Sequence, residues 1–227
     1  MKYPLLVRGL LLGALLTGAT GCLGTTRGSQ SLRSVDNLLT GVQSVHVECE
    51  MVRQEVRATV DRMLRLFQPT TTEDRLAAYA EFEKALDVCE AQMGRFQQSI
   101  AKLETLGPAF FDSWQLELDS YQTANMREQS AARLALTQER YRAILDSSAD
   151  PILMYAGFVT DVRDALLFLG RDLHPEAVRM IEGDLRAILQ EARTLDSAQE
   201  VCQQAARTYL DHTGLPDMGQ VQIEPLP

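Results

Sequence analysis

Residues 79–106, YAEFEKALDVCEAQMGRFQQSIAKLETL, carry the most regular hydrophobic pattern in the chain. Apolar side chains recur there at alternating steps of three and four residues, which puts them on one face of an α-helix and is the heptad pattern of coiled coils and bundles. The positions of this seam are Tyr79, Phe82, Leu86, Cys89, Met93, Phe96, Ile100 and Leu103. The pattern therefore predicts a long helix whose apolar face packs against other helices.

Similar spacing upstream predicts a preceding helix. Apolar residues recur from Leu38 to Phe67, and Pro69 is expected to end this helix. The threonines that follow offer hydroxyl groups for capping the next helix, and Thr70 and Glu73 have the spacing of a capping box. The two helices would form a hairpin that turns at Pro69.

Downstream, Gly107 and Pro108 predict a break, because glycine suits a turn and proline starts a helix well. A third helix is expected to open with Phe110 and to run to about Leu145, with a polar, solvated middle at residues 122–129. The sequence SSADP at 147–151 permits two structures. One is a kink within a longer helix, which we favour, and the other is a turn in which Asp150 caps a new helix.

The last helix is expected to follow the turn GRDLHP at 170–175 and to end near residue 212. The segment 213–227 contains three prolines and no periodicity, and is predicted to be disordered. No segment shows the alternation of a β-strand. The predicted fold is therefore all-α, an elongated antiparallel helical bundle or coiled coil of four to five helices over residues 32–212.

The composition argues against several classes of function. The chain has 227 residues, 45% of them hydrophobic and 23% charged, with a formal net charge of −9. This is the composition of a folded domain rather than a disordered one. The negative balance argues against nucleic-acid binding, which needs clustered Lys and Arg. No glycine-rich phosphate loop, nucleophile elbow or HExxH motif is present in the sequence, so we expect neither an enzyme nor a bound cofactor.

The N-terminal residues have the features of an export signal. Lys2 and Arg8 form a positively charged region before an apolar stretch, GLLLGALLTGA at 9–19, which is shorter than the roughly 20 residues that a spanning helix needs. Residues 1–21 are therefore predicted to be a signal peptide. The sequence ATGC at 19–22 resembles the lipobox of bacterial lipoproteins, in which the cysteine is acylated and becomes the new N-terminus. The alternative is a secreted protein that is cleaved near Gly21 and keeps Cys22 as a thiol.

The lipobox resemblance implies that Cys22 carries a lipid that anchors the chain to a membrane, with about 0.8 kcal/mol of affinity per buried methylene. Residues 22–31 are rich in Gly, Ser and Thr and are predicted to form a flexible tether between anchor and bundle. In lipoprotein sorting, a residue other than Asp after the cysteine, here Leu23, implies the outer membrane rather than the inner. The expected location is the bacterial cell envelope, facing the periplasm.

Three further cysteines follow Cys22, and an oxidising compartment permits disulfides. In a hairpin that turns at Pro69, Cys49 and Cys89 lie at equal distances from the turn and on the apolar seams of their helices. We therefore predict a Cys49–Cys89 disulfide, while Cys202 is expected near the level of the Pro69 turn, about 30 Å from that bridge. The alternative is that all three are small buried hydrophobic residues.

A metal site is not expected. His46 and Cys49 are three residues apart, beside Glu48 and Glu50, and these are ligand types that zinc accepts. No second His or Cys pair supports a zinc site, and the predicted disulfide would consume the sulfur atoms. The other two histidines, His174 and His212, fall at a turn and at a helix end, where a structural or surface role is the simpler interpretation.

Three segments resemble a known family. They are FFDSWQLELDSY at 110–121, ERYR at 139–142 and LLFL at 166–169. Together they are similar to the bacterial lipoproteins grouped as domain of unknown function 2959, over roughly residues 35–212. The resemblance implies a helical envelope lipoprotein, without implying an activity or any site residue. The turn at 170–175 departs from the Asn-containing turn associated with that family.

Two functions fit these observations. In the first, the chain is a structural or interaction protein, a scaffold or adaptor of the envelope that binds another envelope protein or a second copy of itself. The aromatic residues Phe110, Phe111, Trp114 and Tyr121 are the candidate interaction surface, because aromatic side chains dominate interface hot spots. The simpler alternative is that they pack into the core. In the second function, the bundle opens to bind an apolar ligand such as a lipid, with methionines as adaptable lining.

Overall fold

The computed structural model describes residues 24–68 and 71–213, and all regular structure within these ranges is helical. Its elements are α1 (Gly24–Arg65), α2 (Thr72–Leu118), α3 (Ala124–Arg171), α4 (Pro175–Met180) and α5 (Glu182–Thr213). Side chains are described from Leu32 to His212. The predicted signal peptide at 1–21, Cys22 and residues 214–227 lie outside the described residues.

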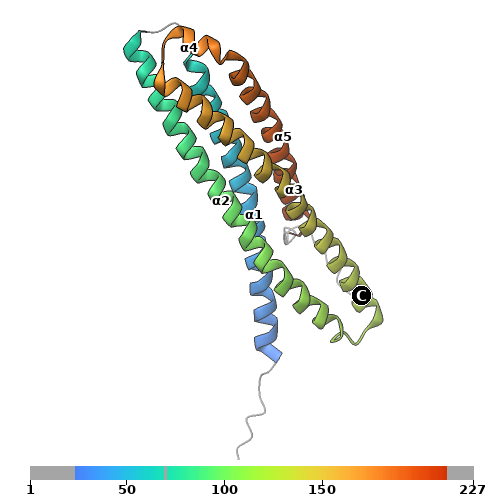
Figure 1. The fold of residues 1–227 in the computed structure, drawn as a ribbon. Helices are drawn as coiled ribbons and strands as arrows, with labels where there is room; N and C mark the ends of the chain where they lie inside the picture. The colour runs from blue at the N-terminus through green and yellow to red at the C-terminus, as the bar shows by residue number, and fades with distance from the viewer. Residues whose placement is uncertain (1–23, 69–70, 214–227) are drawn as a thin grey trace, which may run out of the picture.

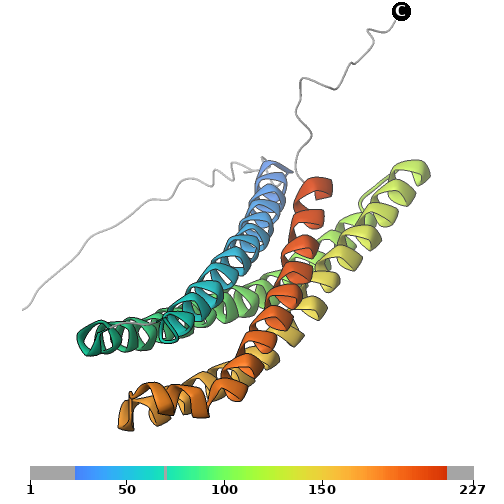
Figure 2. The same cartoon turned by 90° about the horizontal axis from the view of Figure 1, so that it is seen from above.

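The four long helices run alternately up and down the molecule, with the short α4 in the connection between α3 and α5 (Figure 1). α1 packs against α2 and α5, and α3 packs against the same two helices. Viewed from above, the α1–α2 hairpin lies alongside the α3–α5 hairpin (Figure 2). This arrangement confirms the predicted all-α antiparallel bundle.

The four helices differ in length, and the bundle ends are unequal as a result. α5 has 32 residues, whereas α3 has 48. Both meet near α4, so α5 ends about 20 Å before the level at which α3 begins. Beyond that point, the described residues of the bundle are the first turns of α1, the last turns of α2 and the first turns of α3. We call this part, residues 24–36, 107–118 and 124–137, the three-helix end.

The core is the one that the apolar seams predict. The seam positions after Tyr79 are all at most 5% exposed; they are Phe82, Leu86, Cys89, Met93, Phe96, Ile100 and Leu103. Tyr79 is half-buried, and its hydroxyl donates to the Leu166 carbonyl oxygen at 3.0 Å. The core continues through the other three long helices with residues such as Val52, Phe158 and Leu195, all at 0% exposure. Burial of this continuous apolar surface is the main source of stability in such a bundle.

The predicted break at Gly107-Pro108 is wrong, because α2 continues through both residues to Leu118. Pro108 is on the exposed face, where water can replace the helical hydrogen bond that a proline removes. The turn between α2 and α3 lies at residues 119–123, in a sequence that contains neither glycine nor proline. The segment 122–129, expected in the middle of a helix, therefore spans this turn and the start of α3.

Gly107 has a packing role instead. A Cβ added there would overlap the ring of Tyr141 from α3, whose hydroxyl donates to the Leu103 carbonyl oxygen at 3.1 Å. The same arrangement occurs in reverse near the other end of these two helices. Tyr79 of α2 lies on Gly170 of α3, so each helix presents one tyrosine to one glycine of its neighbour. Absence of a side chain at each glycine is what lets the ring approach the backbone.

Pro151 lies inside α3, which is continuous from Ala124 to Arg171. The favoured alternative of one helix is therefore confirmed, and the alternative of a turn at Asp150 is wrong. The hydroxyl of Ser147, one turn before the proline, donates to the carbonyl oxygens of Ala143 and Ile144 at 2.7 and 3.0 Å. Such back-bonding is common where a helix bends.

Two local predictions also need correction at the helix starts. α1 begins at Gly24, so most of the segment predicted to be a flexible tether, 22–31, is helical. A long helix extends readily at its end, because each added residue gains a hydrogen bond without a new nucleation step. The capping box of α2 is formed by Thr71 and Asp74, one residue later than the predicted Thr70 and Glu73.

The predicted Cys49–Cys89 disulfide is also wrong, since Cys49, Cys89 and Cys202 are all free thiols. Cys89 lies beside Thr59 of α1, which is ten residues, or about 15 Å, along the helix from Cys49. The neighbour of Cys49 is Cys202 of α5, which was expected far away. That expectation assumed a turn at Gly107, and the later turn at 119–123 brings α5 to the level of Cys49.

All three thiols are buried, and those of Cys49 and Cys89 are poorly ionised. A hydrogen bond with Cys202, together with burial, raises the pKa of the Cys49 thiol above its usual value. Burial raises the pKa of Cys89 to about 11. Because the thiolate is the reactive and metal-binding form, both cysteines have the character of structural core residues.

Candidate functional site

The four aromatic residues singled out in the sequence lie together at the three-helix end, although their exposure differs. Phe110 and Phe111 are 8% and 6% exposed, and Trp114 and Tyr121 are half-buried. Phe111 packs edge-to-face on Tyr141 with ring centroids 5.1 Å apart, which makes it a core residue. Phe110 packs edge-to-face on Trp114 at 5.6 Å. The candidate surface thus consists of Trp114 and Tyr121, supported from below by Phe110.

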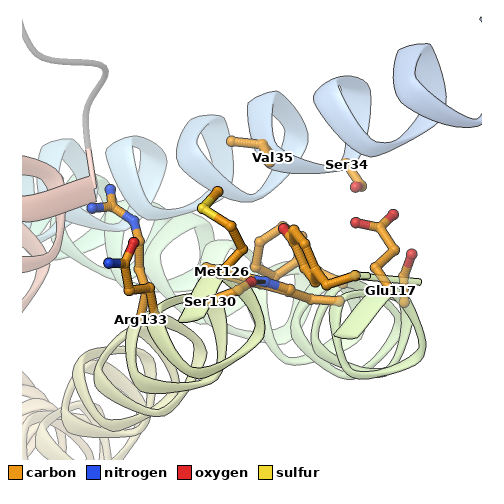
Figure 3. A pocket seen from close by; sticks show the side chains of 11 residues that line it. Ser34, Val35, Glu117, Met126, Ser130 and Arg133 are labelled. Carbon is orange, nitrogen blue, oxygen red and sulfur yellow. Dashed lines mark hydrogen bonds between the residues drawn. The ribbon is translucent and has the colours of Figure 1, made fainter. Parts of the chain in front are cut away.

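These side chains form one wall of a groove with a cavity volume of about 370 Å³. α1 closes one side of this groove with Ser34 and Val35, and α3 provides Met126, Ser130 and Arg133 opposite (Figure 3). The remaining lining residues are Ser113, Glu117 and Gln129. We call this site the end groove. It exists because α5 ends before it can fill the fourth position of the bundle at this level.

The end groove combines an apolar floor with polar edges. The indole Nε1 of Trp114 donates to the Ser130 hydroxyl at 2.9 Å, which fixes the ring between α2 and α3. Met126 is 49% exposed at its rim, and Arg133 is exposed at the edge that faces the end of α5 (Figure 3). An apolar surface with a few placed polar groups is the usual composition of a site that binds an apolar segment or ligand.

A comparison with protein-family models gives a match over most of the chain. A family model described as "Protein of unknown function (DUF2959)" matches residues 30–212, which is most of the chain. The chain belongs to this family. The match confirms the resemblance drawn from the segments at 110–121, 139–142 and 166–169. It covers α1 from residue 30 onward, all of α2, α3 and α4, α5 up to His212, and the whole end groove of the DUF2959 bundle.

Further comparisons add no functional assignment. Neither the curated proteins nor the solved structures contain a match to this DUF2959 chain. Within residues 24–68 and 71–213, no helix is both long and apolar enough to cross a membrane.

The candidate zinc ligands near His46 take part in contacts between helices instead. Glu50 accepts hydrogen bonds from Gln54 and Gln203 at 3.0 and 2.9 Å, and these bonds lower its carboxyl pKa. His46 Nδ1 lies 3.4 Å from the Gln203 carbonyl oxygen of α5. In the described part of the chain, no group of three or more His, Cys, Asp or Glu side chains is arranged to hold a metal ion.

A second hollow, of about 360 Å³, lies between α3 and α5 and is acidic. Asp161, Asp164 and Asp184 contribute to its lining. Beside it, Glu191 of α5 faces Asp161 of α3, and burial together with this neighbouring carboxyl raises the pKa of Glu191. The carboxyl groups therefore repel each other across the α3–α5 interface when all of them are ionised.

This pair predicts a measurable pH dependence. A raised pKa in the folded state means that the folded protein holds the proton more tightly, so the stabilisation is complete at acidic pH and is lost as the pH rises through the raised pKa. Glu191→Gln removes the ionisation, and we expect it to raise the free energy of unfolding at pH 7 and to have little effect at pH 4. Urea unfolding at both pH values measures this, with exposed Glu128→Gln as control. Equal effects of Glu191→Gln at both pH values would contradict the assignment.

Sequence reasoning identified the aromatic wall of the end groove and missed its other walls. Val35, Met126 and Arg133 belong to α1 and α3, and they reach the groove only because the α2–α3 turn lies at 119–123. The feature of the sequence that could have revealed the groove is the unequal length of the last two long helices. A helix that ends at residue 212 cannot cover a partner that begins near residue 124.

Proposed function

We propose that this chain is a lipid-anchored adaptor of the bacterial envelope whose end groove binds an apolar segment of another envelope protein. The observation that carries the proposal is the open fourth position at the three-helix end, which leaves Trp114, Tyr121 and Met126 accessible in a groove. Aromatic residues and methionine are the side chains most enriched in interface cores. The segment bound would have an apolar face and an acidic residue to meet Arg133.

The position of the groove supports an anchored role. α1 begins at Gly24, two residues after Cys22, and reaches the groove at Ser34 and Val35. At 1.5 Å per residue, this distance is about 15 Å. A lipid on Cys22 would therefore hold the groove close to the membrane surface. The periplasmic face of the outer membrane is the proposed location, and the partner would be membrane-bound or would approach that membrane.

An apolar small molecule such as a lipid is the alternative occupant. The cavity volume of about 370 Å³ lies within the range of ligand pockets. The groove is open along one side, however, and Ser113, Gln129 and Arg133 line it. A long acyl chain would leave these polar groups without water or partners, which is costly. We therefore favour a protein segment, whose backbone can hydrogen-bond to them.

Photo-cross-linking in cells tests the proposal. A photoreactive amino acid at Gln129, which is exposed in the groove, should give a discrete adduct with one envelope protein. The same amino acid at Leu153, 75% exposed on α3 away from the groove, is the matched control and should not. Trp114→Ala should abolish the adduct, and Cys22→Ser should release the chain from the membrane fraction.

Each part of the proposal can fail separately. Identical adducts at positions 129 and 153, or none at either, would contradict the adaptor function. Membrane association that survives Cys22→Ser would contradict the lipid anchor. A lipid that co-purifies with the chain and is lost on Trp114→Ala would favour the ligand-binding alternative.

A further inference from the structure

We infer that the C-terminal segment of this chain, residues 214–227, docks in the end groove and has to be displaced by an incoming partner. This inference concerns the regulation of the site described above and rests on the end groove being a binding surface. The register of α3 and α5 brings the end of α5 to the groove. Tyr209 of α5 lies at the level of Tyr141 of α3, and the two helices are antiparallel. α5 therefore ends at Thr213 close to the level of Thr137.

The groove starts where α5 stops. One turn beyond Thr137 on α3 is Arg133, followed by Ser130 and Met126, all of which line the groove. The level of Met126 is about 16 Å beyond the end of α5. An extended chain covers about 3.3 Å per residue, so five or six residues span this distance and residues 214–227 are ample. The chain leaves α5 at the open fourth position, which is the entrance to the groove.

The composition of the segment fits the groove. Residues 214–227, GLPDMGQVQIEPLP, contain apolar side chains suited to a floor of aromatic rings, and no lysine or arginine. These apolar residues are Leu215, Met218, Val221, Ile223 and Leu226. Its first acidic residue, Asp217, is four residues past Thr213. An extended chain of four residues covers about 13 Å, so Asp217 comes between the levels of Arg133 and Met126, where the long Arg133 side chain can reach it.

Attachment to α5 favours this occupant over others. A short chain segment is held near its site at an effective concentration in the millimolar range, so even a weak intrinsic affinity fills the groove. A partner segment in solution, or a second copy of the chain, has to bind tightly enough to compete with a segment that is present at this effective concentration. The segment thus raises the affinity that a partner needs in order to occupy the groove. Deletion of the segment should leave the groove permanently open.

Trp114 makes the inference directly measurable. It is the single tryptophan of the chain, and it lines the groove half-buried. Its fluorescence therefore reports whether the groove is occupied. The comparison uses the purified full-length chain and a variant that ends at Thr213. We expect the shortened chain to emit at longer wavelength, because its indole gains water, while its helicity by circular dichroism stays unchanged.

A synthetic peptide of residues 214–227 provides the second measurement. Added to the shortened chain, it should shift the Trp114 emission back with a saturable dependence on peptide concentration. Arg133→Asp in the shortened chain should weaken peptide binding by about three- to ten-fold, the effect of losing one exposed ion pair and gaining a repulsion. A peptide carrying Asp217→Arg should bind the Arg133→Asp chain better than the natural peptide does. This charge reversal distinguishes registered docking from non-specific apolar binding.

Three results would overturn the inference. The first is identical emission of the full-length and shortened chains with no saturable response to the peptide. The second is peptide binding that neither Arg133→Asp nor Asp217→Arg changes. The third is an emission shift that depends on protein concentration and accompanies dimer formation, since the groove would then hold a second copy. None of these bears on cross-linking from Gln129, so the adaptor function and the docking of the segment fail or stand independently.

Discussion

Gly107→Ala is expected to destabilise the protein by about 2–4 kcal/mol. The added Cβ would overlap the Tyr141 ring, which is 7% exposed and packed against Phe111. Overpacking of a filled core costs about 1–3 kcal/mol. The helices can separate only by losing the hydrogen bond from the Tyr141 hydroxyl to the Leu103 carbonyl oxygen, worth about 1 kcal/mol. The free energy of unfolding in urea, monitored by circular dichroism, measures the change.

Gly94→Ala is the matched control in the same helix. A Cβ there meets nothing within 4 Å, so alanine should bring only its higher helix propensity and stabilise by up to about 1 kcal/mol. Opposite signs for the same substitution would identify packing, rather than backbone freedom, as the role of Gly107. Tyr141→Leu should relieve part of the cost of Gly107→Ala in the double variant. A neutral or stabilising Gly107→Ala would show that Tyr141 does not lie on this glycine.

Gln199→Leu is expected to stabilise the bundle by about 1–3 kcal/mol. Gln199 is 0% exposed on the apolar seam of α5, and its side-chain Oε1 and Nε2 have no hydrogen-bond partner among the described residues. A buried amide without partners carries a desolvation cost of this size, which leucine of similar volume does not. The shift in the midpoint of thermal or urea unfolding gives the measurement.

Gln92→Leu is the corresponding control, and it should have the opposite effect. Gln92 is 1% exposed, but its amide donates to Glu48 at 2.5 Å and accepts from Arg95 at 2.8 Å. Leucine would leave both charged partners without this contact, at a cost of about 1–3 kcal/mol. If Gln199→Leu also destabilised the protein, the Gln199 amide would have a partner such as a buried water.

The long-range architecture was predictable because it depends on periodicity. The seam of residues 79–103 became a buried helix face, since steps of three and four residues leave no other way to cover so much apolar surface. Local sequence signals were less reliable. Gly107-Pro108 has the composition of a turn, yet Gly107 is required by Tyr141, which is far away in sequence. The true turn at 119–123 has only Asp, Ser, Tyr, Gln and Thr to mark it.

The candidate site was predictable only in part for the same reason. Trp114 and Tyr121 could be found from their spacing, whereas their partners across the groove depended on which turn joined the helices. The cysteine prediction failed for a different reason. Distance along a hairpin gives the level of Cys49, but the residue it contacts also depends on which of two neighbouring helices it faces, and it faces Cys202 of α5.

The two reciprocal tyrosine–glycine contacts limit how this molecule could relay a signal. Tyr79 lies on Gly170 and Tyr141 lies on Gly107, at points about 40 Å apart along both helices. Sliding α2 along α3 by a single residue would remove both rings from their glycines at once. A bundle pinned at two such points is unsuited to piston-like transmission along its axis. Any change of state at the end groove would instead reach the far end by sideways movement of α1 or α5 against this fixed pair.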